Sequence, residues 1–223
     1  MALAGPGGCW VPTLDVVVDA VLFDFGGGIT SSPFEAFATY EAEAGLPAGT
    51  IRLLNATNPD ENAWARLERN EVDRAGFADL FDSEAAALGF EVDAARVLAA
   101  LDGQLRPEMV EAVRRCSARL ATALLTNNIE PIDERTHSQE HDEVVGLFDV
   151  IVQSSVVGCR KPEPRFYEIA CQQLGVTPSS CVFLDDLGVN LKPARAMGMT
   201  TIKVFDPAQA LTELAVLVGF PLG

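Results

Sequence analysis

The stretch Ala20-Val21-Leu22-Phe23-Asp24-Phe25-Gly26-Gly27-Gly28 joins a short apolar run to an acidic residue and, just beyond it, three glycines. An apolar run bounded by glycine predicts a buried strand of a parallel sheet. In open α/β sheets, ligands bind in the crevice outside the carboxyl ends of the strands. The glycines permit a sharp turn whose backbone N–H groups can face an anion. We therefore expect Asp24 to be presented to an anionic ligand at the end of the first strand.

The composition is that of an ordinary globular protein. The 223 residues are 48% hydrophobic and 22% charged, which suits one large domain or a core with a small cap. The net charge of -16 disfavours nucleic-acid binding, because that requires a basic surface. A small anionic ligand remains compatible with this charge if a few basic residues gather at one site. No apolar run reaches the roughly 18 residues of a membrane span, so no membrane partner is expected.

The five cysteines are widely spaced, odd in number and without a CxxC motif. This pattern predicts free thiols in a reducing compartment rather than disulfides or structural zinc. Residues 1–19 contain no Lys or Arg, so they do not resemble a signal peptide. We therefore expect a cytoplasmic protein, and the oligomeric state stays open.

Residues 33–105 differ in pattern from the segments on either side. Their apolar residues recur at helical spacing, with breaks at Gly45-Leu46-Pro47 and Asn58-Pro59-Asp60, and this predicts several helices and no strand. Because the block directly follows the first strand, we interpret it as a mobile helical cap over the crevice. A helical layer packed on the sheet is the alternative. The predicted division is an α/β core of residues 1–32 and 106–223 with a cap of residues 33–105.

Strand and helix patterns alternate again after residue 106. Further strands are predicted at residues 121–125, 148–152, 181–184 and 201–205, with helical segments or loops between them. Such alternation is typical of a Rossmann-like, doubly wound parallel sheet.

Polar side chains follow several of these strands. Thr126 and Asn127 end the second strand, Asp185 and Asp186 end the fourth, and Lys161 lies in a loop between them. Because the ends of parallel strands converge on one edge of the sheet, these residues are expected to meet Asp24.

This combination has a chemical logic. A carboxylate can attack phosphorus and form an aspartyl-phosphate. Mg²⁺ held by carboxylates would offset the repulsion between the nucleophile and the phosphate. A hydroxyl, an amide and an ammonium group would bind the remaining phosphoryl oxygens. Taken singly, an Asp after a strand is more often a helix cap, Thr-Asn is turn chemistry and a loop lysine is solvated. The ordered set is much less expected by chance.

The chain resembles the haloacid dehalogenase superfamily of hydrolases, in the branch with a helical cap inserted after the first strand. It is similar there to the N-terminal phosphatase domains of soluble epoxide hydrolases. The segments that carry the resemblance are 21–27, 124–128, 160–167 and 182–199. The resemblance covers about residues 16–215 and is weakest in the cap, where this family sets its substrate choice.

The resemblance implies a role for each matched position. Asp24 matches the nucleophile, and Thr126 with Asn127 matches the phosphate-binding pair. Lys161 matches the lysine of the third motif, and it counts as both catalytic and substrate-binding. The metal ligands implied for Mg²⁺ are Asp24, Asp185, Asp186 and the backbone carbonyl of Gly26, and Asn190 matches a polar position that supports the acidic pair. The expected partner is a small phosphorylated substrate.

Gly26 departs from the usual phosphatase pattern. Phosphatases of the family carry a second aspartate at this position as general acid and base, and glycine cannot protonate a leaving alkoxide. Such a proton transfer is typically worth about 10²–10⁴-fold in rate. The histidines His137 and His141 lie in a polar loop and are assigned no role.

Three readings of the function follow from these residues. The first is a Mg²⁺-dependent phosphatase that forms an aspartyl-phosphate at Asp24. The second is a 2-haloacid dehalogenase, which also lacks an acid at the position of Gly26 but needs no metal, so the pair Asp185-Asp186 fits it less well. The third is a catalytically weak binding or regulatory module that keeps the phosphate cradle.

Overall fold

The computed structural model describes residues 17–101, 103–129 and 138–223. Its centre is a five-stranded, fully parallel sheet with the strand order β3-β2-β1-β4-β5. The strands are β1 (Ala20–Asp24), β2 (Ala121–Thr126), β3 (Val150–Gln153), β4 (Cys181–Asp185) and β5 (Thr200–Lys203). The chain moves outward from β1 to β3 and then returns to place β4 on the other side of β1. This reversal confirms the doubly wound α/β fold and puts its ligand crevice beside the end of β1.

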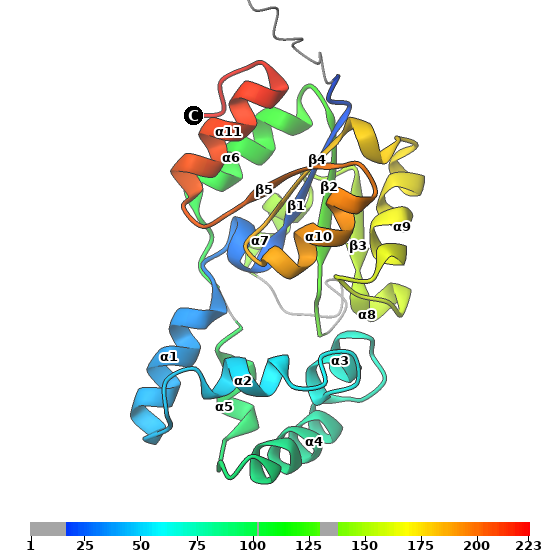
Figure 1. The fold of residues 1–223 in the computed structure, drawn as a ribbon. Coiled ribbons are helices and arrows are strands. Elements are labelled where there is room, and N and C mark those ends of the chain that lie inside the picture. Colours follow the sequence, from blue (N-terminus) through cyan, green and yellow to red (C-terminus); the bar gives the residue numbers. More distant parts are fainter. Residues whose placement is uncertain (1–16, 102, 130–137) are drawn as a thin grey trace, which may run out of the picture.

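Helices cover both faces of the sheet (Figure 1). One face packs on α6 (Pro107–Ser117), α7 (Gln139–Val145) and α11 (Pro207–Val218), and the other packs on α9 (Pro164–Leu174) and α10 (Gly188–Ala196). Side chains of β1 alternate between the two cores: Val21 and Phe23 face the first, Ala20 and Leu22 the second. All four are fully buried, which is why this strand reads as an unbroken apolar run.

A second group of helices lies beyond the carboxyl ends of the strands (Figure 1). It contains α1 (Pro33–Ala44), α2 (Thr50–Ala56), α3 (Ala63–Glu68), α4 (Arg74–Ala87) and α5 (Ala94–Ala99), and we call it the helical unit. The unit has a core of its own, built around Trp64, Phe77 and Phe81. Side chains of Asn62, Asp73 and Asp93 cap the first turns of α3, α4 and α5, respectively.

Two chain segments connect the helical unit to the sheet, and they run side by side. The backbone N–H of Ser31 donates to the carbonyl of Gln104 at 2.8 Å, and Arg106 N–H donates to the carbonyl of Ile29 at 2.9 Å. A bridge between Thr30 and Leu105 completes the connection. The chain therefore enters and leaves the helical unit through two adjoining segments. The division into a core of residues 1–32 and 106–223 and a cap of residues 33–105 stays a prediction. Whether the unit moves as a cap stays a prediction.

Several elements differ from the sequence-based expectation. The third strand begins at Val150 rather than at residue 148, and the fifth ends at Lys203 rather than at residue 205. The segment expected to be a polar loop after β2 contains α7, whose first turn is capped by Ser138. No helix is predicted from the sequence after the last strand, whereas the structure has α11, which Asp206 caps and Pro207 opens.

Cys116, Cys159, Cys171 and Cys181 are buried free thiols, as the sequence predicts for them, and Cys9 lies outside the described residues. Burial raises the pKa of the Cys116 thiol to about 12, which makes it unreactive. No described helix combines the length and the apolar character that crossing a membrane requires.

Candidate active site

Three side chains from distant parts of the sequence meet at the end of β1. The ammonium group of Lys161 lies 2.5 Å from Asp24 Oδ1 and 2.8 Å from Asp185 Oδ2, and it donates a hydrogen bond to each. Lys161 is 2% exposed, Asp24 6% and Asp185 0%. A buried lysine between two buried carboxylates forms a site because each charge offsets the desolvation of the others.

Asp185 is fixed by further donors. The side-chain amide of Asn190 lies 3.0 Å from both of its carboxylate oxygens, and the backbone N–H of Leu187 donates to Oδ1 at 2.8 Å. Together with Lys161, these groups bond every oxygen of the carboxylate. The arrangement agrees with the supporting role that the resemblance implies for Asn190.

The glycine turn after Asp24 allows Asp186, the residue that follows β4, to lie close to the backbone of the turn. Gly27 has φ +88°, and a Cβ atom at this position would lie 2.3 Å from Asp186 Oδ2. Only glycine combines this backbone conformation with so close an approach. The opposite holds at Gly26, where an added Cβ would meet no atom within 4 Å. The turn therefore has room for a side chain at residue 26 that the sequence does not supply.

Thr126 and Asn127 lie at the same edge of the sheet. Asp24 pairs with Leu125 in the register of β1 and β2, so Thr126 is one residue beyond it. The side chain of Asn127 is held reciprocally by Lys161: its Oδ1 accepts from Lys161 N–H at 2.9 Å, and its Nδ2 donates to the Lys161 carbonyl at 3.0 Å. Asn127 is thus tied by two hydrogen bonds to the backbone of the predicted lysine.

Burial shifts the pKa values of these groups. Desolvation raises the pKa of Asp24 well above its ordinary value, although Lys161 opposes the shift. Desolvation and the charge of Asp185 raise the pKa of Asp186 to about 6. Burial alone would lower the pKa of Lys161, but Asp185 and Asp24 outweigh it and hold the value above the ordinary one. Lys161 therefore stays charged, and its single positive charge does not balance the negative charges of the three aspartates.

The acidic cluster fits a divalent cation. Asp24, Asp185 and Asp186 each offer one carboxylate oxygen, and these atoms lie within 4.8 Å of one another. Hard oxygen donors with this excess of negative charge suit Mg²⁺. The predicted ligand set of Asp24, Asp185, Asp186 and the Gly26 carbonyl stays a prediction.

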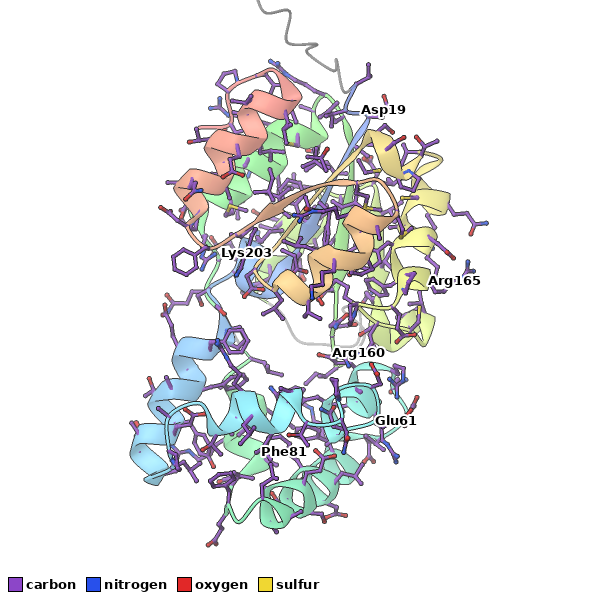
Figure 2. The ribbon with its side chains drawn as sticks, in the orientation of Figure 1. Asp19, Glu61, Phe81, Arg160, Arg165 and Lys203 are labelled. Atoms are coloured by element: carbon purple, nitrogen blue, oxygen red, sulfur yellow. The ribbon has the colours of Figure 1, made fainter. Side chains whose placement is uncertain are left out.

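The structure also brings to the site a residue that sequence reasoning missed. Glu68, the last residue of α3, reaches from the helical unit to the core: its Oε2 lies 3.2 Å from Asn127 Nδ2 and 2.5 Å from Arg160 Nε. Arg160 also donates to the carbonyl of Pro59 at 2.8 Å. Figure 2 shows Arg160 where the core meets the helical unit. In the sequence, Glu68 is one glutamate among others in a helical pattern, so nothing local indicates its contact with Asn127 and Arg160.

Other side chains with polar groups pack or pair within their own part of the fold. Trp64 packs on Phe77 with ring centroids 4.9 Å apart, and Arg69 pairs with Glu71. His141 belongs to α7, where its Nδ1 lies 2.8 Å from the Ser138 hydroxyl, and His137 lies outside the described residues.

Residues 18–198 match the haloacid dehalogenase-like hydrolase family, and this range includes every side chain of the cluster. The chain belongs to this family. It is therefore a hydrolase by family, and the resemblance inferred from its motifs is confirmed.

Three relatives indicate the branch. The chain is 35% identical over 213 residues to acyl-CoA dehydrogenase family member 10 of Mus musculus, a match that covers 91% of this chain and 19% of that protein. It is 41% identical over 116 residues to bifunctional epoxide hydrolase 2 of Rattus norvegicus, which covers 51% of this chain and 21% of the relative. A sesquiterpene phosphatase of Aspergillus oryzae is 28% identical over 204 residues, covering 90% of this chain and 96% of the relative. The chain thus spans about a fifth of the first two proteins' length.

Solved structures share the fold. A dehalogenase with an intermediate complex superposes with a TM-score of 0.64 at 20% identity, covering 91% of this chain and 97% of that one. A haloacid dehalogenase family enzyme of Bacteroides thetaiotaomicron, in complex with magnesium and inorganic phosphate, superposes with a TM-score of 0.57 at 18% identity. It covers 83% of this chain and 93% of that one. At this level of identity, the likeness concerns the fold.

Proposed function

We propose that the protein is a Mg²⁺-dependent phosphatase that acts on a small phosphorylated metabolite through an aspartyl-phosphate at Asp24. The observation that carries the proposal is the meeting of three carboxylates and one buried lysine at the carboxyl end of β1. The lysine and a hard cation together offset the negative charge that three carboxylates and a phosphate would otherwise concentrate.

Each residue has a distinct part in the proposed reaction. Asp24 attacks phosphorus, and Lys161 holds its carboxylate in place through the hydrogen bond to Oδ1. Thr126 binds a phosphoryl oxygen through its hydroxyl, and Asn127 binds one through its backbone N–H, since Lys161 and Glu68 accept both N–H bonds of its side chain. Asn190 keeps Asp185 oriented toward the cluster. Asp24, Asp185 and Asp186 would hold Mg²⁺, with the Gly26 carbonyl as a further ligand. When bound, the cation supplies positive charge beside the transferring phosphoryl group.

Two of the similar proteins support this reading. The Aspergillus relative that matches this chain nearly end to end is a sesquiterpene phosphatase, and the Bacteroides enzyme was solved with magnesium and inorganic phosphate. We further propose that residues 33–105 act as a cap that closes over the substrate and excludes water. The two adjoining connections at Ser31 and Gln104 would serve as its hinge.

The alternative function is a weak phosphate-binding module. Gly26 favours it, because glycine stands where phosphatases of the family carry the general acid and no other side chain of the described residues fills the space beside it. A dehalogenase function is compatible with the shared fold. However, a dehalogenase reacts at carbon without a metal, so it does not explain the paired carboxylates of Asp185 and Asp186.

Phosphate release separates these readings. The test uses p-nitrophenyl phosphate, acetyl phosphate and sugar phosphates, first with Mg²⁺ and then with EDTA, and chloride release from 2-chloropropionate in parallel. The proposal expects Mg²⁺-dependent phosphate release that Asp24→Asn abolishes. Chloride release without Mg²⁺ would establish the dehalogenase, and no release from any substrate would establish the binding module.

A further inference from the structure

The proposed phosphatase needs a proton donor for an alcohol leaving group, and the turn after Asp24 provides none. Gly26 occupies the position where a carboxyl group would stand, and the space beside it is open. The three aspartates of the cluster already have proposed roles as metal ligands, and Asp24 is also the proposed nucleophile. A donor must therefore come from elsewhere in the fold.

The direction of the reaction limits where this donor can be. In phosphoryl transfer, the attacking and leaving oxygens lie roughly in line with phosphorus between them. Asp24 attacks from the end of β1, so the leaving oxygen points away from the sheet. The helical unit lies on that side (Figure 1).

Glu68 is a carboxyl group of the helical unit that contacts the proposed phosphate-binding residue Asn127. Its Oε2 lies 3.2 Å from the amide of Asn127, and that amide is bonded in turn to the backbone of Lys161. The side chain is 15% exposed, so it is largely shielded from water yet reachable.

Among the described residues, the polar contacts of Glu68 are made by Oε2. Arg160 Nε and Asn127 Nδ2 both approach Oε2, so Oε1 is the position for a proton. Burial raises the pKa of Glu68, which favours the protonated form. The facing charges of Arg160 and Lys161 and the hydrogen bond from Asn127 oppose this shift without cancelling it.

We propose, on the basis of the phosphatase function above, that Glu68 is the general acid and base that replaces the missing carboxyl group at residue 26. Asp24 forms a bond to phosphorus while the bond from phosphorus to the substrate oxygen breaks. The electron pair of the broken bond takes the proton from Glu68 Oε1, and the alcohol leaves. Water then attacks the phosphorus of the aspartyl-phosphate and gives its proton to the Glu68 carboxylate, while the bond from phosphorus to Asp24 breaks and its electron pair returns to the Asp24 carboxylate. This step releases inorganic phosphate and restores both residues.

The test compares Glu68→Gln with the wild type on two substrates in Mg²⁺. Glycerol phosphate has a poor leaving group and needs the proton, whereas p-nitrophenyl phosphate has a good one and does not. We expect turnover of glycerol phosphate to fall about 10²–10⁴-fold in the variant. With p-nitrophenyl phosphate, the variant should give a rapid burst of one nitrophenolate per enzyme and then a slow steady rate, because hydrolysis of the aspartyl-phosphate lacks its base.

Three comparison variants separate this role from a structural one. Glu71→Gln removes an exposed carboxylate that pairs with Arg69 on the same unit, and it should leave both rates unchanged. Arg160→Gln breaks the ion pair but keeps the acid, so the ratio of the two rates should stay within a few-fold of the wild type. Adding Gly26→Asp to Glu68→Gln should restore turnover of glycerol phosphate, because the open space at residue 26 accepts a carboxyl group.

Several outcomes would overturn the inference. Equal losses on both substrates in Glu68→Gln without a burst, matched by Arg160→Gln, would show that Glu68 only joins the helical unit to the core. An unchanged rate on glycerol phosphate, or a wild type that hydrolyses p-nitrophenyl phosphate but no alkyl phosphate, would also refute it. Failure of the wild type on p-nitrophenyl phosphate and every other phosphate tested would instead refute the proposed function itself.

Discussion

Replacing Asp186 by asparagine should stabilise the protein in EDTA. The folded state holds this carboxylate beside Asp185, and burial together with that neighbouring charge raises its pKa from 3.8 to about 6. A rise of about two units, at about 1.36 kcal/mol per unit, corresponds to about 3 kcal/mol of lost stability at neutral pH. Partial exposure of the side chain reduces this figure, so we expect a gain of about 2 kcal/mol from Asp186→Asn.

The pH dependence of this gain follows from the sign of the shift. A carboxyl group whose pKa is higher in the folded state costs stability only where it is ionised. Below pH 3.8 it is protonated in both states, and the gain from Asp186→Asn should vanish. The gain should grow between about pH 4 and 6 and be complete at pH 7.

Urea unfolding, followed by circular dichroism, measures the effect with EDTA and then with Mg²⁺. The amide oxygen introduced by Asp186→Asn can still accept the hydrogen bond from the Ser32 hydroxyl, so the change mainly removes charge. Mg²⁺ at 100 times its dissociation constant should add about 2.7 kcal/mol to the wild type and much less to the variant. Asp82→Asn, an exposed change on α4, controls for net charge. A variant less stable than the wild type in EDTA at pH 7, or a gain that persists at pH 3.5, would refute the reasoning.

Three further substitutions test the same cluster. Gly27→Ala should cost about 1–2 kcal/mol through its positive φ and should weaken Mg²⁺ binding in calorimetry, because the new Cβ displaces Asp186; unchanged affinity would contradict the close approach. Asn190→Ala should cost about 1.5–3 kcal/mol in urea unfolding, since it removes the amide that bonds Asp185; a neutral effect would show that this support is dispensable. Lys161→Met should cost about 3–5 kcal/mol in EDTA by leaving two buried carboxylates unpaired, and a variant as stable as the wild type in the same unfolding assay would argue against that pairing.

The strands and the candidate site were accessible from sequence for a local reason. A strand buried on both faces must be apolar throughout, so Ala20–Asp24 and Cys181–Asp185 stand out, and the polar residue that ends each one stands out with it. The parallel fold class then implies that these ends meet. Residues matched to a phosphate site in this way gather as expected: Lys161 contacts both Asp24 and Asp185.

The weaker predictions failed where tertiary contacts outweigh local pattern. Helix α7 is polar in sequence, and its burial rests mainly on Val144 against the sheet.

The sequence by itself determined the doubly wound core and the chemical types at the strand ends, because burial and turn geometry constrain each residue locally. Only the tertiary structure decided how the helical unit meets that edge. Glu68 and Asn127 are 59 residues apart in the chain, and their contact depends on how two separately packed cores are joined. No local pattern encodes such a distance, since it is set by the packing of side chains that the two segments do not share.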